Sequence, residues 1–105
     1  MAWVLLVLAG VMEIVMAAGL KSAAGWTKPV PAAIGVAAGL ASIFLLTYAI
    51  RDLPTGTAYA VWTGIGAVGV TIVGIIAYGD SASLPRLACV ALIMAGIAGL
   101  RWLEA

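Results

Sequence analysis

The sequence is short and strongly apolar. Of its 105 residues, 66% are hydrophobic and 9% are charged, whereas a soluble domain carries about 25% charged residues. The net charge of +1 argues against a nucleic-acid-binding protein, and the absence of histidine argues against a His/Cys metal cluster. The one cysteine cannot form a disulfide within the chain. We therefore expect an all-α membrane protein with the lipid bilayer as its surroundings, no nucleic-acid partner and no cofactor.

Long uncharged runs separated by short charged segments predict four transmembrane helices. A span needs about 20 apolar residues to cross a hydrocarbon core of about 30 Å. The runs place the spans at residues 2–20, 29–50, 54–78 and 85–103. With their short connections they form a single predicted domain over residues 1–105, which leaves no room for a separate soluble domain.

The first predicted span contains Glu13, which is the one ionisable residue deep inside any span. A charge at the middle of the membrane costs about 2.5–3.5 kcal/mol on insertion scales, and such residues usually have a function. Glu13 can hold a proton, release it and bind a cation in its place; a protonated, hydrogen-bonded structural glutamate is the alternative. Gly10, three residues earlier, leaves open space beside the carboxyl group. Because no Lys or Arg precedes Lys21, a cleaved signal peptide is disfavoured.

The second and third spans supply polar and aromatic groups. Ser42 lies in the second span, and Tyr59 and Trp62 lie on neighbouring turns of the third. Trp62 is too far into its span to belong to an interfacial aromatic belt; its N–H needs an acceptor and its ring face can hold a cation. Gly64 and Gly66 follow and predict a hinge, with the ordinary enrichment of glycine in membrane helices as the alternative.

Small residues mark one face of the fourth span. In lipid, such residues let two helix backbones approach closely. We therefore predict a dimer contact there, formed by Ala91, Ala95, Gly96 and Gly99.

The positive charges are almost equally divided between the two sides of the membrane. With four spans, Arg51 and Arg101 share the side of the N-terminus, and Lys21, Lys28 and Arg86 lie on the other. Lys and Arg in short loops set orientation. This balance favours a chain that inserts both ways round and pairs as an antiparallel dimer; a weak bias that fixes one topology is the alternative.

The motif Ala58-Tyr59-Ala60-Val61-Trp62, followed by Gly64-Ile65-Gly66, together with Glu13 and the four-span length, resembles the small multidrug resistance family. Residues 62–69, Trp-Thr-Gly-Ile-Gly-Ala-Val-Gly, are typical of its guanidinium exporter branch. The resemblance implies an antiparallel homodimer in the bacterial inner membrane that exchanges protons for small organic cations at Glu13. It also implies that the lining of this site includes Gly10, Ser42, Tyr59 and Trp62.

One position departs from the guanidinium branch. That branch usually has a tryptophan three residues after the glutamate, where it donates to the carboxylate, and this sequence has Met16. Methionine cannot donate a hydrogen bond and is flexible and polarizable. We count Met16 among the substrate-binding residues and expect it to widen the substrate range; a subunit that works with a second paralogue is the alternative.

Three functions follow from these observations. The leading one is proton-coupled antiport that exports guanidinium and small substituted guanidiniums. The alternative is a promiscuous proton-coupled exporter of quaternary ammonium and lipophilic cations. The third is a small assembly or regulatory membrane subunit without transport of its own, and Glu13 argues against it. The sequence shows no pairing of a nucleophile with a base and no cofactor loop, so we expect a secondary transporter and not an enzyme.

Overall fold

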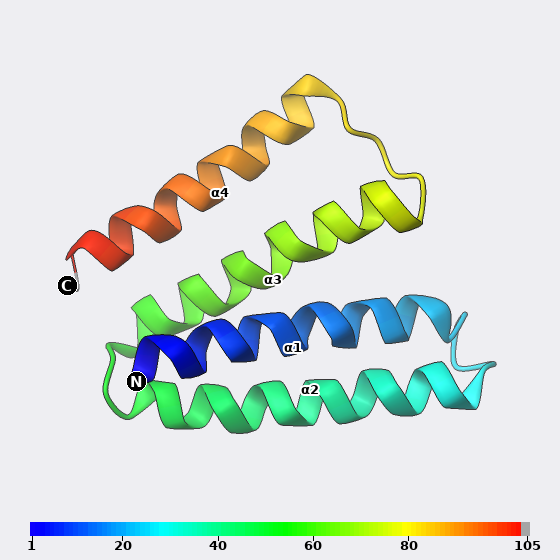
Figure 1. Ribbon diagram of the computed structural model, residues 1–105, viewed down its shortest axis with the longest axis horizontal. Coiled ribbons are helices and arrows are strands. Elements are labelled where there is room, and N and C mark those ends of the chain that lie inside the picture. Colours follow the sequence, from blue (N-terminus) through cyan, green and yellow to red (C-terminus); the bar gives the residue numbers. More distant parts are fainter. Residues whose placement is uncertain (104–105) are drawn as a thin grey trace.

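The computed structural model describes residues 1–103 and consists of four helices joined by short connections (Figure 1). Their bounds are α1 Ala2–Ser22, α2 Pro29–Ile50, α3 Thr55–Ala77 and α4 Leu84–Leu103. Each is long and apolar enough to cross a membrane, which confirms the expectation of an all-α protein with four apolar helices. The last two residues of the predicted single domain, Glu104 and Ala105, lie outside the described residues.

Local backbone preferences explain where the helices begin and how sharply the chain turns. Pro29 occupies the first position of α2, where its missing N–H would have had no intrahelical partner, and Pro54 is the residue that precedes α3. The turn before α2 contains three consecutive residues with positive φ: Ala24, Gly25 and Trp26. This left-handed stretch reverses the chain in a few residues, so α1 and α2 lie side by side and antiparallel (Figure 1).

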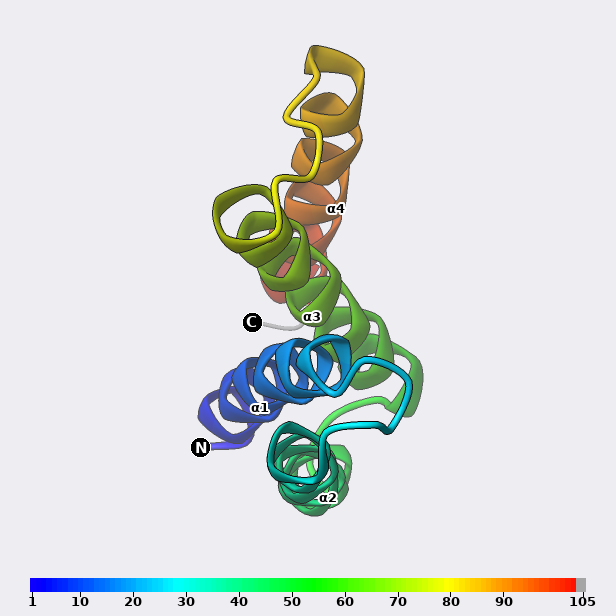
Figure 2. The ribbon, with the colours of Figure 1, turned by 90° about the vertical axis from the view of Figure 1, so that its right-hand side faces the viewer.

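The first three helices form the packed part of the protomer. α1 lies against both α2 and α3, while α2 and α3 touch each other less extensively (Figure 2). Glycines bring the helix backbones together, since a methyl group on Gly19 of α1 would stand only 2.7 Å from the Gly35 nitrogen of α2. The core gathers toward the ends of α1, α2 and α3 that lie near the N-terminus. It consists of Leu6, Ala9, Leu46, Ala49, Ala58 and Val61.

The fourth helix stands apart from this core. The backbone of α4 approaches α3 alone, and its start swings away from the other helices (Figures 1 and 2). The contact is made where Ile93 and Ile97 pack beside Gly64 of α3. None of the described residues of α4 is buried, and Leu92 is 72% exposed. Within one protomer, α4 therefore presents most of its apolar surface outward.

Candidate functional site

A chain of two hydrogen bonds joins the three packed helices. The indole Nε1 of Trp62 on α3 donates to the hydroxyl of Ser42 on α2 over 2.8 Å. The Ser42 hydroxyl in turn donates to the carbonyl of Ala9 on α1 over 2.7 Å. Because Ser42 is only 1% exposed, both bonds are shielded from competing partners. The arrangement fixes the indole of Trp62 and engages its N–H with the serine.

Glu13 lies one turn beyond Ala9, near the middle of the 21-residue α1. A side chain on Gly66 of α3 would collide with its carboxyl group, so the missing Cβ of this glycine makes the room that the carboxyl occupies. The Oε2 atom is buried and has no hydrogen-bond partner among the described residues. Buried polar atoms in proteins are nearly always paired, so this oxygen is expected to have a partner beyond the described residues. This oxygen can accept an N–H of a ligand or take up a proton.

Further small residues let α1 and α3 come this close. A methyl group on Gly10 would stand 2.8 Å from Cβ of Ile65, and one on Gly69 would overlap the side chain of Ile14. Gly10 lies one turn before Glu13, and the side chain of Ile65 fills the space that the missing Cβ of this glycine leaves. The carboxyl group lies between these two tight contacts, which hold the helices at a fixed separation.

Met16 lies in the contact of α1 with α2, and its i, i+3 spacing from Glu13 makes the two residues neighbours on the surface of α1. Its sulfur packs against Gly39 of α2, where an added methyl group would come within 2.9 Å of it. The structure thus places Met16 one turn from Glu13 along α1, in the contact between α1 and α2.

Tyr59 extends the site outward from Trp62. The two rings lie 5.3 Å apart between centroids and are tilted by 60°. The tyrosine is 58% exposed in the protomer, whereas Ser42 behind it is buried. Ser42, Trp62 and Tyr59 are thus joined by one hydrogen bond and one ring contact, and the exposure of the side chains rises from the serine to the tyrosine.

The two glycines predicted as a hinge have different neighbours. α3 continues as one helix through both of them. Gly64 faces Ile97 of α4, while Gly66 faces Glu13 of α1. Each glycine allows a close approach in this state of the protein, and the hinge itself remains a prediction.

The residues predicted for the dimer contact have no neighbours across their face in the protomer. Ala91, Ala95, Gly96 and Gly99 are all exposed. A methyl group on Gly96 or on Gly99 would meet nothing within 4 Å. This strip of α4 is therefore open to another helix.

Sequence reasoning missed the role of α2 as a wall of small residues. Gly35, Gly39 and Ser42 are buried and contact α1 at successive turns. Their spacing of four and three residues is the signal that could have identified this face.

Known proteins resemble this chain along nearly its whole length. The sequence profile of the family described as Small Multidrug Resistance protein matches residues 1–93. The chain is 54% identical over 101 residues to a protein of Yersinia pseudotuberculosis named Guanidinium exporter, covering 96% of this chain and 97% of that protein. Proteins of the same name from Citrobacter freundii and Escherichia coli are 54% and 52% identical over 101 residues, with 96% of each chain covered. With its four apolar helices, this chain belongs to the small multidrug resistance family and is a multi-pass protein of the bacterial inner membrane.

Proposed function

We propose that this chain is a proton-coupled antiporter that exports guanidinium and small substituted guanidinium cations, with Glu13 as the shared proton and cation site. It is a transporter and not an enzyme. The observation that carries the proposal is the buried Oε2 of Glu13, which has no hydrogen-bond partner within residues 1–103 although it lies near the middle of a membrane-spanning helix. The names of the relatives support guanidinium as the cargo.

The chemistry of the site suits a small planar cation. Guanidinium carries its N–H groups in a planar fork, and two of them can bond to the two oxygens of one carboxylate. A cation beside Trp62 would also be attracted to the face of the indole, whose orientation Ser42 fixes. Once the Glu13 carboxyl takes up a proton it loses the charge that attracts the cation. Proton and cation would then occupy the site in turn, which is the requirement for exchange.

The functional unit in this proposal is an antiparallel homodimer. One protomer is too thin to enclose a pathway, because its smallest principal extent is 16 Å and one helix is about 10–12 Å across. The open strip of α4 at Ala91, Ala95, Gly96 and Gly99 is the surface proposed for the contact between protomers. A second protomer would bring a second Glu13 to a shared chamber, and the balanced positive charges favour its opposite orientation.

Export of quaternary ammonium and lipophilic cations is the second candidate, and Met16 favours it. Its thioether lies against Gly39 and offers no hydrogen-bond donor near the carboxyl group. A flexible methionine side chain can adjust to bulky apolar groups, whereas binding of guanidinium is favoured by polar partners at fixed positions.

Replacement of the carboxyl group tests the proposal. Glu13→Gln keeps nearly the same volume and cannot ionise, so guanidinium-driven proton movement in proteoliposomes should fall to the level of empty vesicles. Asp52→Asn is the matched control, since it removes an exposed carboxylate in the α2–α3 turn and should leave transport unchanged. Near-normal exchange by Glu13→Gln, with helical content and dimer fraction preserved, would reject Glu13 as the exchange site.

A further inference from the structure

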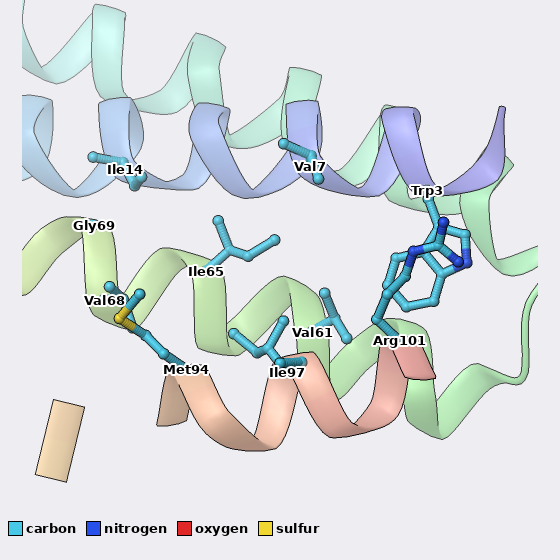
Figure 3. Close-up of a pocket in the computed structure, with 11 residues that line it drawn as sticks. Trp3, Val7, Ile14, Val61, Ile65, Val68, Gly69, Met94, Ile97 and Arg101 are labelled. Atoms are coloured by element: carbon cyan, nitrogen blue, oxygen red, sulfur yellow. The ribbon is translucent and has the colours of Figure 1, made fainter. Parts of the chain in front are cut away.

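A long apolar groove runs along the protomer between α1, α3 and α4 (Figure 3). Its volume is about 540 Å³. Val7 and Ile14 of α1 form one wall, and Met94 and Ile97 of α4 form the opposite one (Figure 3). Neither Glu13 nor Trp62 lines it, so this groove is separate from the cation site.

One end of the groove carries a positive charge. The guanidinium of Arg101 lies 4.9 Å from the centroid of the Trp3 ring, and both residues line the groove at this end (Figure 3). No described carboxylate comes within ion-pair distance of Arg101; the ion pair of the described residues joins Arg86 to Asp80 in the α3–α4 connection. Trp3 and Arg101 lie near the ends of α1 and α4, at the depth where a membrane meets water.

The length of the groove corresponds to one leaflet of a bilayer. Trp3 and Ile14 are eleven residues apart on α1, which spans about 17 Å at a rise of 1.5 Å per residue. Half of a hydrocarbon core of about 30 Å is about 15 Å. The groove therefore reaches from the interface to the middle of the membrane.

We propose that this groove binds one anionic phospholipid, with an acyl chain between α1, α3 and α4 and the phosphate of the headgroup at Arg101. The occupant is lipid because the helices around the groove cross a membrane, where acyl chains are the surrounding medium. The headgroup is anionic because Arg101 supplies a cation at the interfacial end and no other described residue that lines the groove is charged. The stacked Trp3 ring holds the guanidinium over the mouth of the groove.

A second copy of the chain could also cover this groove. The residues of α4 that line the groove argue against that alternative. On this helix the groove is lined by Met94, Ile97, Ala98 and Arg101. None of these belongs to the open strip of small residues proposed for the dimer contact. The proposal of a lipid in this groove does not rest on which cation the protein transports.

Lipid titration of the purified full-length protein tests the proposal. In native mass spectrometry, the wild type should bind dioleoyl phosphatidylglycerol more tightly than dioleoyl phosphatidylcholine. A basic residue near an anionic lipid surface contributes enough attraction for about a fivefold difference in affinity. Arg101→Gln should remove that preference, and Arg101→Lys should retain it.

Two matched controls separate the groove from general effects. Arg51→Gln removes another cation that lies over an aromatic ring, in this case the ring of Tyr48. Neither Arg51 nor Tyr48 lines the groove, so this variant should keep the lipid preference. Ala98→Phe fills the groove and should lower the affinity for both lipids about fivefold. Ala88 is exposed on α4 outside the groove, so Ala88→Phe should leave both affinities unchanged.

Three results would overturn the proposal. The first is an unchanged lipid preference in Arg101→Gln. The second is that Arg51→Gln loses as much of the preference for the anionic lipid as Arg101→Gln does, which would indicate attraction to the general positive charge of the protein. The third is a fall in the dimer fraction of Ala98→Phe without a change in lipid affinity, which would assign the groove to a second copy of the chain.

Discussion

The Glu13 carboxyl group occupies space that is free only because Gly66 has no Cβ atom. Gly66 faces it across the α1–α3 contact, and a Cβ at that position would overlap the carboxyl group. Contacts at Gly10 and Gly69 on either side of this level are also tight, so moving the helices apart to make room would lose packing at both positions. The glycine is therefore part of the site, although it offers no functional group.

Gly66→Ala should lower the rate of guanidinium transport about fivefold or more. The added methyl group has to displace the carboxyl group or push α1 from α3, and overpacking of this kind costs about 1–3 kcal/mol. Initial rates of guanidinium-driven proton movement in proteoliposomes measure the effect. Gly56→Ala is the control on the same helix, because a methyl group there meets nothing within 4 Å. Equal rates in the two variants would show that the approach of Gly66 to Glu13 has no role in transport.

At the scale of helices, the contact of α1 with α2 is more extensive than that of α1 with α3, and it is formed differently. Gly19 and Gly35 bring the two backbones together, and Met16 covers Gly39 beyond them. Ser42 follows Gly39 by three residues on α2 and forms the polar end of this wall. Position 16 therefore lies between the glycine surface of α2 and the turn that carries Glu13.

Met16→Trp should narrow the substrate range. A tryptophan places an N–H donor and a rigid ring near the carboxyl group, which favours guanidinium over a cation with an apolar tail. One hydrogen bond to a charged group is worth about 1.5–3 kcal/mol, so the ratio of the two transport currents should change about tenfold or more. The currents for guanidinium and for a tailed quaternary ammonium are measured in the same proteoliposomes.

Met16→Leu serves as the control for that experiment, because it keeps an apolar side chain of similar size and adds no donor. The wild-type ratio should persist in Met16→Leu. If the wild-type protein already excludes tailed cations, then Met16 does not widen the range and the interpretation of this position is wrong.

The number and type of the helices could be predicted from the sequence, whereas the pattern of apolar residues does not predict their facing surfaces. Charged residues interrupt the apolar runs, and this alone separates the four helices. Within each run, however, apolar residues cover every face of the helix, so periodicity does not tell which face packs inward. The small-residue face of α2 and the isolation of α4 therefore came only from the structure.

The same limit applies to the candidate site. The sequence singled out Glu13 by its charge, and Ser42 and Trp62 as polar groups in apolar surroundings. It could not predict that Ser42 accepts from Trp62, since these partners are 20 residues apart and lie on different helices. The roles proposed for these residues stay predictions until transport is measured.

At the scale of the whole molecule, the protomer is a layer of helices with two open faces. Its principal extents are 42, 34 and 16 Å, and α4 contributes no buried residue among those described. Because a layer only 16 Å thick is too thin to enclose a solute pathway, we expect two protomers to pair. In a bilayer, the balanced positive charges decide whether the two copies have the same or opposite orientation.

Labelling of single cysteines tests the proposed antiparallel dimer in intact cells. In a Cys89→Ser background, a cysteine appended after Ala105 and, separately, Ala82→Cys in the exposed α3–α4 connection are treated with a membrane-impermeant maleimide. If the chain inserts both ways round, each position should be labelled to about half from outside and to completion after permeabilisation. The two sites are matched, because four spans place them on opposite sides of the membrane. Complete labelling of one site from outside and none of the other would reject an antiparallel homodimer, since every copy would then share one orientation.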